Sequence, residues 1–328
     1  MGRMRGYVPA LVAAAVMLIA SACGSDGPGA TATDVDVGFQ QFSVTAGEGA
    51  VWVVPDPGGD GPTNQVLRLD PETGEPLGDP VTVPGTPWVV AADDGQVWVA
   101  HSDFDGGENG LTRIDPSTGA VTDDTIPLDF TPSRLDYRDG TAWIVEEEAD
   151  DIIRVDTATG ETTAIAFSER EFLSHVAVGS GGVWVAGVEG TLNQQPFLDR
   201  IDPETNRRSP EPIVPEGDGS MNELAAPGEA LWVSRGTANE VLLVEIDSSS
   251  QQSIGVGAQP GPIAAGDADV WVGNQDDDTV SRIDVDTGDV VDTIDVAGRP
   301  SALSVGDGAV WVAIESGTNL SRIELEEG

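Results

Sequence analysis

The chain has 328 residues, with 57 acidic side chains against 15 basic ones, all of them arginine, and a formal net charge of −42 at pH 7. Such a surface repels nucleic acid and anionic lipid headgroups, so we expect no nucleic-acid partner, and it favours cations or cationic partners. Adaptation of the whole surface to salt is an equally good explanation of the charge.

The first 22 residues have the three parts of an export signal. Arg3 and Arg5 give a positive start, Val8 to Ala20 is apolar, and Ala20-Ser21-Ala22 is a small-residue cleavage site. The apolar stretch is too short to span a bilayer, which favours a signal peptide over an anchor helix. Its removal takes away two arginines and no acidic residue, so the remaining chain carries 13 basic and 57 acidic side chains, a net charge of about −44.

The only cysteine, Cys23, directly follows this cleavage site. The segment Ile19 to Cys23 resembles the bacterial lipobox, whose cysteine receives a diacylglyceryl group and becomes the new N-terminus. It departs at Ala20, where the lipobox prefers Leu, and plain secretion is the alternative. We expect Cys23 to carry the lipid, and residues 23–32 to be a flexible tether at the outer side of the cell membrane. One cysteine allows no disulfide within the chain.

Residues 33–328 repeat one phrase: a small turn, a Val-Trp-Val-like strand, a variable gap, and an Arg-Ile-Asp-Pro-x-Thr-Gly-like turn. Seven of the eight tryptophans mark the same position of this phrase, with spacings of 46, 45, 41, 48, 39 and 40 residues. Such a period with short strands predicts an all-β, seven-bladed propeller that forms one domain. The seven are Trp52, Trp98, Trp143, Trp184, Trp232, Trp271 and Trp311.

The last repeat has only three predicted strands before the chain stops, at residues 301–305, 309–313 and 319–324. The sixth repeat has a fourth strand, residues 290–296, and a shift of the sequence by 259 residues places residues 33–37 on its end. We therefore predict that residues 33–37 supply the outer strand of the last blade, which closes the ring and removes an exposed edge. Deletion of residues 31–40 should then collapse stability.

Two further residues recur with the repeat. Aromatic side chains at one identical strand position are typical of packing between blades, so we do not interpret the seven tryptophans as a stacking platform for a ligand. The arginine of the Arg-Ile-Asp unit is expected to pair with an aspartate of a neighbouring strand. These arginines are Arg68, Arg113, Arg154, Arg200, Arg282 and Arg322.

The units Gly-Ala-Val-Trp-Val-Ala, Arg-Ile-Asp-x-x-Thr-Gly and Val-Ala-Gly-Arg-Pro-Ser resemble those of the YVTN and virginiamycin B lyase-like seven-bladed propellers of bacteria, over residues 33–328. The resemblance implies the fold. For activity it is unspecific, because this group holds a metal-assisted lyase together with many proteins without known catalysis. That lyase uses a histidine base and a metal-holding His and Glu in its later blades, whereas here no histidine follows His175.

Loops after the second and fourth strands of each blade share one face and vary in length, so we predict that a small molecule or a protein binds there to a monomeric propeller. The residues three positions after each Trp differ between repeats, which suits the rim of a pocket. His175 begins an inner strand, and Arg299 enters the same face. The predicted ligand-binding residues are His101, Glu146, His175, Arg235, Asn274 and Arg299.

Acidic clusters leave a Ca²⁺ site open, although none completes a known loop motif and solvated loops are the simpler interpretation. We predict no cofactor and no catalytic residue, because there is no nucleophilic cysteine in the repeats and no Gly-x-Ser-x-Gly elbow. We therefore predict a binding or scaffold protein. The alternative is a divalent-cation-dependent lyase or hydrolase that uses His101, Glu146 and His175. The acidic clusters are Asp103, Asp105 and Glu108; Glu146, Glu147 and Glu148; Asp276, Asp277 and Asp278.

Overall fold

The computed structural model describes residues 30–102, 109–146, 151–168, 171–179, 181–190, 195–217 and 220–324. The predicted signal peptide, the predicted lipidation site at Cys23 and most of the predicted tether lie outside these residues. Within the described part, no helix is long and apolar enough to cross a membrane.

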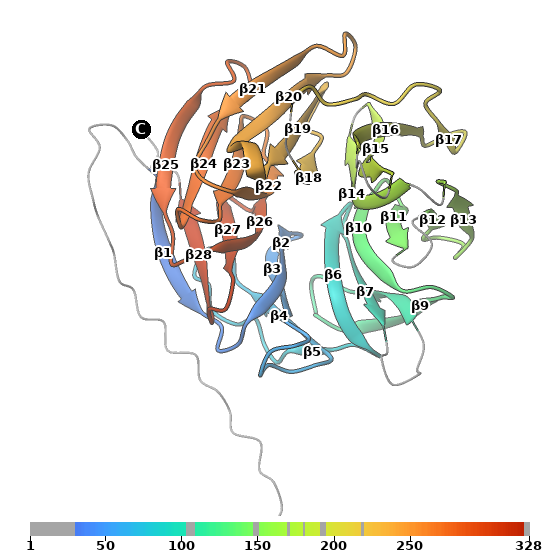
Figure 1. Cartoon of the computed structure of the whole chain (residues 1–328). Helices are drawn as coiled ribbons and strands as arrows, with labels where there is room; N and C mark the ends of the chain where they lie inside the picture. The colour runs from blue at the N-terminus through green and yellow to red at the C-terminus, as the bar shows by residue number, and fades with distance from the viewer. Residues whose placement is uncertain are drawn as a thin grey trace, which may run out of the picture.

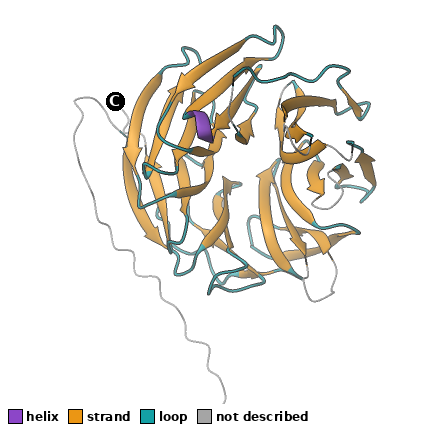
Figure 2. Ribbon diagram, viewed as in Figure 1, coloured by secondary structure: helices purple, strands orange, loops and turns teal. Residues whose placement is uncertain are grey.

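The described residues form seven antiparallel sheets of four strands, arranged as blades around a central axis (Figures 1 and 2). This confirms the seven-bladed all-β propeller. Blades 1 to 3 are β2 (Gln41–Gly47), β3 (Ala50–Pro55), β4 (Gln65–Leu69) and β5 (Val81–Thr82); β6 (Thr86–Asp93), β7 (Gln96–Ser102), β8 (Asn109–Ile114) and β9 (Val121–Leu128); and β10 (Pro132–Arg138), β11 (Thr141–Glu146), β12 (Ile152–Asp156) and β13 (Thr162–Ile165).

Blades 4 to 6 are β14 (Glu171–Gly179), β15 (Gly182–Glu189), β16 (Gln195–Asp202) and β17 (Arg207–Arg208); β18 (Met221–Ala225), β19 (Ala230–Arg235), β20 (Glu240–Glu245) and β21 (Gln251–Gly255); and β22 (Pro260–Ala265), β23 (Asp269–Asn274), β24 (Thr279–Asp284) and β25 (Val290–Asp295). Blade 7 is β26 (Pro300–Gly306), β27 (Ala309–Ile314), β28 (Asn319–Glu324) and β1 (Thr31–Asp36). A short helical turn, η1 (Gly236–Ala238), follows β19.

The N-terminal strand closes the ring. β1 pairs antiparallel with β28 over six residue pairs, from Thr31 opposite Glu324 to Asp36 opposite Asn319. Figure 1 shows the blue β1 beside the red β28. The predicted closure is confirmed, and the strand starts at Thr31, two residues earlier than expected. Val35 on this strand is 5% exposed and packs with Leu320 and with blade 1.

The hydrophobic core is divided into seven clusters that lie between blades. In each cluster the repeated tryptophan of one blade contacts apolar side chains of the next: Trp52 of blade 1 lies against Val90 and Val99 of blade 2. Trp311 of blade 7 lies against Val53 of blade 1, which completes the circle. All seven are 0% to 3% exposed, so their predicted role in packing is confirmed.

The repeated arginines do not all behave as expected. Arg282 pairs with Asp269 on the neighbouring strand, at 2.8 Å. Arg68 instead donates to the carbonyl oxygen of Pro116 at 3.0 Å, and Arg322 to that of Pro71 at 2.8 Å. Both carbonyls belong to the Asp-Pro turn of the following blade. The arginine side chain is long enough to cross the blade interface and reach them. For Arg68 and Arg322 the expected aspartate pair is therefore replaced by a bond between blades.

The inner strands share one irregularity near the loop-rich face, by which we mean the face that carries the loops after second strands and the connections between blades. In all seven, the ladder to the second strand shifts register close to the start of the strand. A β-bulge re-aims the side chains around it. The shifts fall between Gln41 and Ser43, Pro87 and Val89, Pro132 and Arg134, Leu173 and His175, Met221 and Leu224, Pro260 and Ile263, and Pro300 and Ala302.

Candidate functional site at the mouth of the central channel

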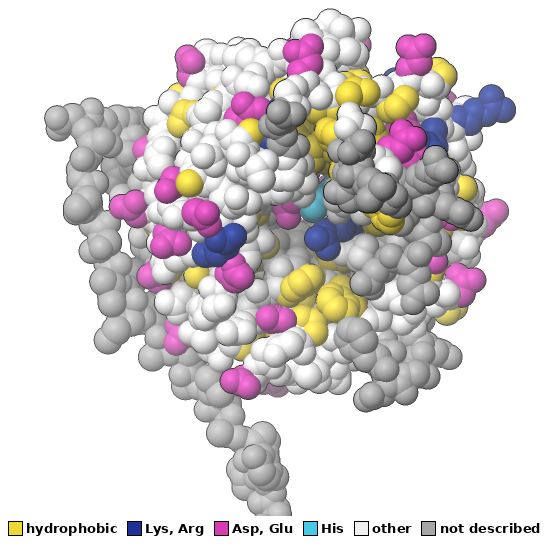
Figure 3. Space-filling view, in the orientation of Figure 1, with side chains coloured by type: hydrophobic (Ala, Val, Ile, Leu, Met, Phe, Trp, Pro, Cys, Tyr) yellow, Lys and Arg dark blue, Asp and Glu magenta, His cyan; other side chains and the backbone are white. Residues whose placement is uncertain are grey.

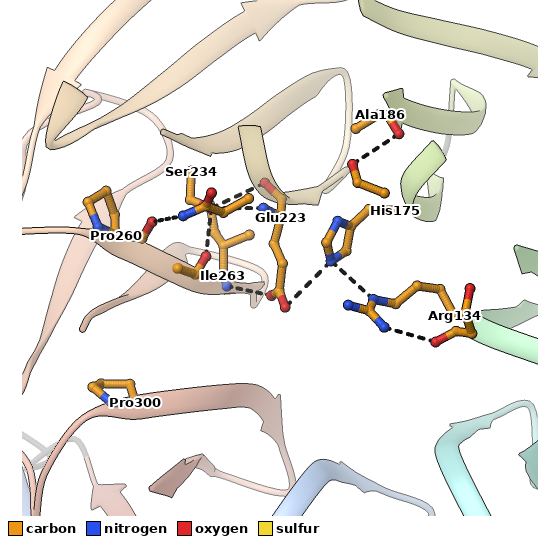
Figure 4. A network of polar contacts seen from close by, with 12 residues as sticks. Arg134, His175, Ala186, Glu223, Ser234, Pro260, Ile263 and Pro300 are labelled. Atoms are coloured by element: carbon orange, nitrogen blue, oxygen red, sulfur yellow. Dashed lines mark hydrogen bonds and ion pairs between the residues drawn. The ribbon is translucent and has the colours of Figure 1, made fainter. Parts of the chain in front are cut away.

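Three ionisable side chains from adjacent inner strands meet at the bulges. Arg134 of β10 donates from Nε to His175 Nε2 of β14 at 3.3 Å, and that nitrogen lies 3.6 Å from Glu223 Oε1 of β18. Figure 4 shows the three side chains in one line across the inner strands. We call them the charged row. Each lies nine residues before the Trp of its blade, where the other blades carry Ser43, Val89, Pro262 and Ala302.

The bulges beneath the row are fixed by side-chain hydrogen bonds. Ser133 donates to the carbonyl oxygen of Val145, and Ser174 donates to that of Ala186, both at 3.1 Å. Each bond ties the bulged residue of an inner strand to the second strand of the same blade. The backbone that presents Arg134 and His175 is therefore held in one conformation.

Glu223 is held from two sides. Its Oε2 accepts the N–H of Ile263 from the next blade at 3.1 Å, and its own N–H donates to Ser234 Oγ at 3.0 Å (Figure 4). Burial would raise the pKa of Glu223, but the hydrogen bond with His175, the Ile263 N–H and the nearby charges of His175 and Arg134 outweigh it. The pKa lies below its ordinary value, so Glu223 is a carboxylate at neutral pH.

His175 Nε2 lies between a group that only donates and a group that only accepts. Arg134 needs this nitrogen unprotonated, whereas Glu223 needs it protonated. The two contacts are therefore alternative states of one histidine. Its Nδ1 is buried and has no hydrogen-bond partner within the described part of the chain. The row can thus exchange a hydrogen-bond partner without a change of fold.

An aromatic pair forms another part of the mouth. Phe42 of β2 and Trp88 of β6 occupy the bulges of blades 1 and 2, with ring centroids 5.5 Å apart in an edge-to-face arrangement. Phe42 is 36% exposed, and Trp88 Nε1 donates to Ser102 Oγ at 2.5 Å. Figure 3 shows a hollow at the centre of this face with a histidine at its wall, basic and acidic side chains beside it, and hydrophobic side chains below.

A cavity of about 430 Å³ opens next to Phe42, where blades 6, 7 and 1 meet. Arg299 lies in it with all three guanidinium nitrogens engaged: Nε with Glu315 at 2.6 Å, Nη1 with Asp276 at 2.5 Å and Nη2 with Gln275 at 3.3 Å. The predicted residues His175 and Arg299 therefore both lie at the mouth, in different parts of it.

His101, in contrast, does not reach the rim. It is 1% exposed, and its Nε2 lies 2.9 Å from Thr112 Oγ1 within blade 2. The ring fits so closely that a Cβ added to Gly85 or Gly110 would come within 2.9 or 2.8 Å of it. Desolvation lowers the pKa of His101 to about 4, so it is a neutral, buried side chain at neutral pH.

Arg235 and Asn274 are buried at the equivalent position, at 1% and 0% exposure. Arg235 pairs with Glu240 at 2.7 Å, and Asn274 donates to Thr279 and Ser281 at 3.0 and 2.9 Å. These side chains are buried and do not form the rim, because the position three residues after each Trp belongs to the second strand, whereas the first strand lines the channel.

Glu146 shares this position of the repeat and ends the second strand of blade 3, partly buried. The functional candidates that the sequence analysis missed are Arg134, Glu223, Phe42 and Trp88. The sequence carried a signal for two of them. Arg134 and Glu223 each lie nine residues before the Trp of their blade, as the predicted residue His175 does.

The trio of the enzyme hypothesis is not assembled. His101 contacts Thr112, whereas His175 contacts Arg134 and Glu223. Among the described residues there is no group of three His, Cys, Asp or Glu side chains that could hold a metal ion. Of the acidic clusters, Asp276 pairs with Arg299 and Asp277 accepts the N–H of Ala258 at 2.6 Å. Outside the described residues lie Asp103, Asp105, Glu108, Glu147 and Glu148.

A second cavity, of about 440 Å³, lies between blades 3 and 4 on the opposite face. Its lining includes Trp143 and Arg200, which belong to the repeated packing positions, and the turn residues Asp202 and Pro203. This is a gap between two blades that is lined in part by the repeated packing and turn positions. The mouth, by comparison, gathers side chains that no other position of the repeat shares.

No family model matches the chain, and no curated protein matches its sequence. Solved structures do match its shape. Hydrazine synthase of Kuenenia stuttgartiensis aligns with a TM-score of 0.72 and 15% identity over 93% of this chain and 98% of that one. The WD40 β-propeller domain of Doa1 aligns with a TM-score of 0.66 and 12% identity over 88% and 94%. At such identities the likeness shows the propeller fold alone.

Proposed function

We propose that this protein is an extracytoplasmic binding propeller that is tethered to the cell membrane through Cys23 and takes a ligand at the mouth of its central channel. The charged row is the observation that carries the proposal. The propeller scaffold is commonly used for binding, which is a fold-level analogy only.

The charged row is not required by the ring. Bringing ionisable groups together in a partly closed channel costs desolvation energy that their mutual attraction only partly offsets. Blades 1, 2, 6 and 7 form the same four-stranded sheets with Ser43, Val89, Pro262 and Ala302 at the same position. A cost without a packing benefit is typical of a functional site.

The chemistry of the mouth suggests a ligand with mixed character. Arg134 supplies N–H donors and Glu223 supplies carboxylate acceptors, while Phe42 and Trp88 supply an apolar wall. A small zwitterion, a short peptide or a sugar offers both kinds of hydrogen-bonding group together with apolar surface. The mouth therefore fits a small polar molecule.

The tether sets where the mouth would work. From Cys23 to Ala30 the chain has eight residues, which span at most about 28 Å when extended. A lipid on Cys23 would hold the propeller within that distance of the membrane, although its acidic surface repels anionic headgroups. A ligand would then be captured close to the cell surface.

The binding part is tested by thermal unfolding of the full chain, purified in detergent, with a panel of amino acids, dipeptides and sugars. We expect at least one compound to raise the Tm of the wild type, and Arg134→Ala and Glu223→Gln to abolish that rise. Arg138→Ala is the matched control, because Arg138 lies at the other end of the same strand in an exposed pair with Asp93. A panel without effect, or an effect that survives both mouth substitutions, would count against the proposal.

The anchor is tested separately. Labelled palmitate should enter the wild-type protein and not Cys23→Ala, and the variant should appear in the medium instead of the membrane fraction. Retention of Cys23→Ala at the membrane would contradict lipidation at this residue.

A further inference from the structure

We propose that the cavity between blades 6, 7 and 1 is a second binding site, which takes a small organic ammonium ion. Its volume of about 430 Å³ lies within the range of small-molecule sites. The residues that carry the argument are Gln41, Phe42, Asp56, Arg299 and Glu315, which line it.

A buried acceptor in the wall lacks a donor. Gln41 is 5% exposed, and its Nε2 donates to the carbonyl oxygens of Phe39 and, at 3.4 Å, of Gly317. Its Oε1 has no hydrogen-bond partner within the described part of the chain. A buried carbonyl oxygen without a donor is unfavourable, and a turn of the Gln41 amide toward the adjacent cavity would let an N–H group of a ligand satisfy it.

The charge of the cavity favours a cation. Among the described residues that line it, Arg299 is the one basic side chain, and its nitrogens are already bound to Glu315, Asp276 and Gln275. Asp56 adds a further carboxylate to the lining beside Glu315, and Asp276 binds Arg299 next to it, so three carboxylates and one guanidinium lie in or beside the cavity. Glu315 and Asp276 are 54% and 56% exposed, which leaves carboxylate oxygens accessible to a ligand. The net charge of −42 also draws cations toward the molecule as a whole.

An aromatic ring completes the site. Phe42 is 36% exposed and lines the cavity, and Trp88 holds it edge-to-face at 5.5 Å. An ammonium group is attracted to the face of an aromatic ring, and an apolar body packs against it. Carboxylate, amide oxygen and ring thus all favour a primary ammonium ion with an apolar body.

This site is separate from the charged row. The cavity uses blades 6, 7 and 1, whereas Arg134, His175 and Glu223 come from blades 3, 4 and 5. Phe42 is common to both proposed sites, but Gln41 and Glu315 line only the cavity, and Arg134 and Glu223 belong only to the charged row. Substitutions of these four residues therefore let the two proposals fail independently.

The test is calorimetric titration of the full chain with phenethylammonium and three compounds of similar shape: its trimethylated form without N–H groups, the neutral 2-phenylethanol and the anionic 3-phenylpropionate. We expect phenethylammonium to bind with one-to-one stoichiometry. The trimethylated compound should bind about tenfold more weakly, as the loss of a charged hydrogen bond implies. The alcohol and the carboxylate should give no measurable heat of binding.

Glu315→Gln and Gln41→Leu should each weaken phenethylammonium binding about tenfold or more. Arg138→Ala and Glu223→Gln should bind it like the wild type. Glu315 is largely exposed, so its variant is expected to fold, and unfolding curves check both variants. Equal affinity for the trimethylated or anionic compound, wild-type affinity in Glu315→Gln, or loss of affinity in Glu223→Gln instead would each overturn the proposal.

Discussion

Two positions of the repeat differ in how far the seven blades agree on the residue that they carry. At the tryptophan position all seven blades carry the same residue, 0% to 3% exposed and packed against the next blade. Nine residues earlier, at the channel mouth, no two blades agree. The residues there are Ser43, Val89, Arg134, His175, Glu223, Pro262 and Ala302.

The difference follows from what ring closure requires. Seven interfaces of one ring must have nearly the same shape, so one large side chain recurs at each of them. At the channel mouth the blades are held by different contacts: Val89 and Ala302 pack against core clusters, whereas Glu223 accepts the Ile263 N–H of the next blade. No single side-chain shape is required there, which leaves that position open to chemistry. Substitutions at the two positions should therefore have opposite profiles, with large effects on stability at the first and on binding at the second.

The largest effect is expected at the closure of the ring. Deletion of Thr31 to Asp36 removes six residue pairs of the β1–β28 ladder, uncovers Leu320 and exposes an edge strand. We expect a loss on the order of 5 kcal/mol in the free energy of unfolding, enough to abolish a stable fold. Thermal unfolding measures it, with deletion of residues 24–28 from the predicted tether as the control. An unchanged Tm would contradict the closure.

The next effect separates two tryptophans of different kinds. Trp311→Ala should cost about 3–5 kcal/mol, because it empties a 0% exposed position between blades 7 and 1. Trp88, the eighth tryptophan, lies at the mouth beside Phe42, and Trp88→Ala should cost about 1–2 kcal/mol. Denaturant unfolding of both variants tests the contrast. Equal losses would mean that the mouth is part of the packing after all.

The fold could be predicted from the sequence, because its cause is repeated seven times. The period of the tryptophans, the turn motifs and the shifted match of residues 33–37 are consequences of blade packing that show directly in the residue pattern. The bounds of β1 and of several other strands differed by one or two residues. The partners of Arg68 and Arg322 also differed, since a long side chain can cross to the next blade.

The mouth could be predicted only in part. We expected the residues three positions after each Trp to line the rim of a pocket. His101, Arg235 and Asn274 have this position, but they lie on the second strand and are buried. Which residues of the first strand face the channel depends on the bulge, because one extra residue reverses the alternation of side chains. The bulged residues have no common signature: they include Phe42 and Ser133.

A third effect contrasts the two histidines as pH falls. Unfolded His101 takes up a proton near pH 6.5, but folded His101 only near pH 4. Between these values the unfolded state binds more protons, so the free energy of unfolding decreases as pH falls, by up to about 3 kcal/mol. In His101→Gln this component should vanish between pH 6.5 and 4, whatever its stability at pH 7. Denaturant unfolding across that range measures the slope.

His175→Gln is the matched control for this slope. It removes the histidine at the mouth and leaves His101 in place, so the loss of stability between pH 6.5 and 4 should persist. A flat profile in His175→Gln, or an unchanged slope in His101→Gln, would show that another group titrates in this window.

The smallest effect on stability is expected for the charged row itself. Arg134→Ala removes the bonds to Ser133 and His175, and Glu223→Gln keeps a side chain that can still accept the Ile263 N–H. Arg134 is partly buried and the Glu223 side chain is 33% exposed, and pairs that remain open to solvent contribute about 0–1 kcal/mol. We expect each variant to unfold within about 1 kcal/mol of the wild type at pH 7 while it loses ligand-induced stabilisation. A cost above about 2 kcal/mol would make the row a structural bridge between blades 3, 4 and 5, and the proposed function would lose the observation on which it rests.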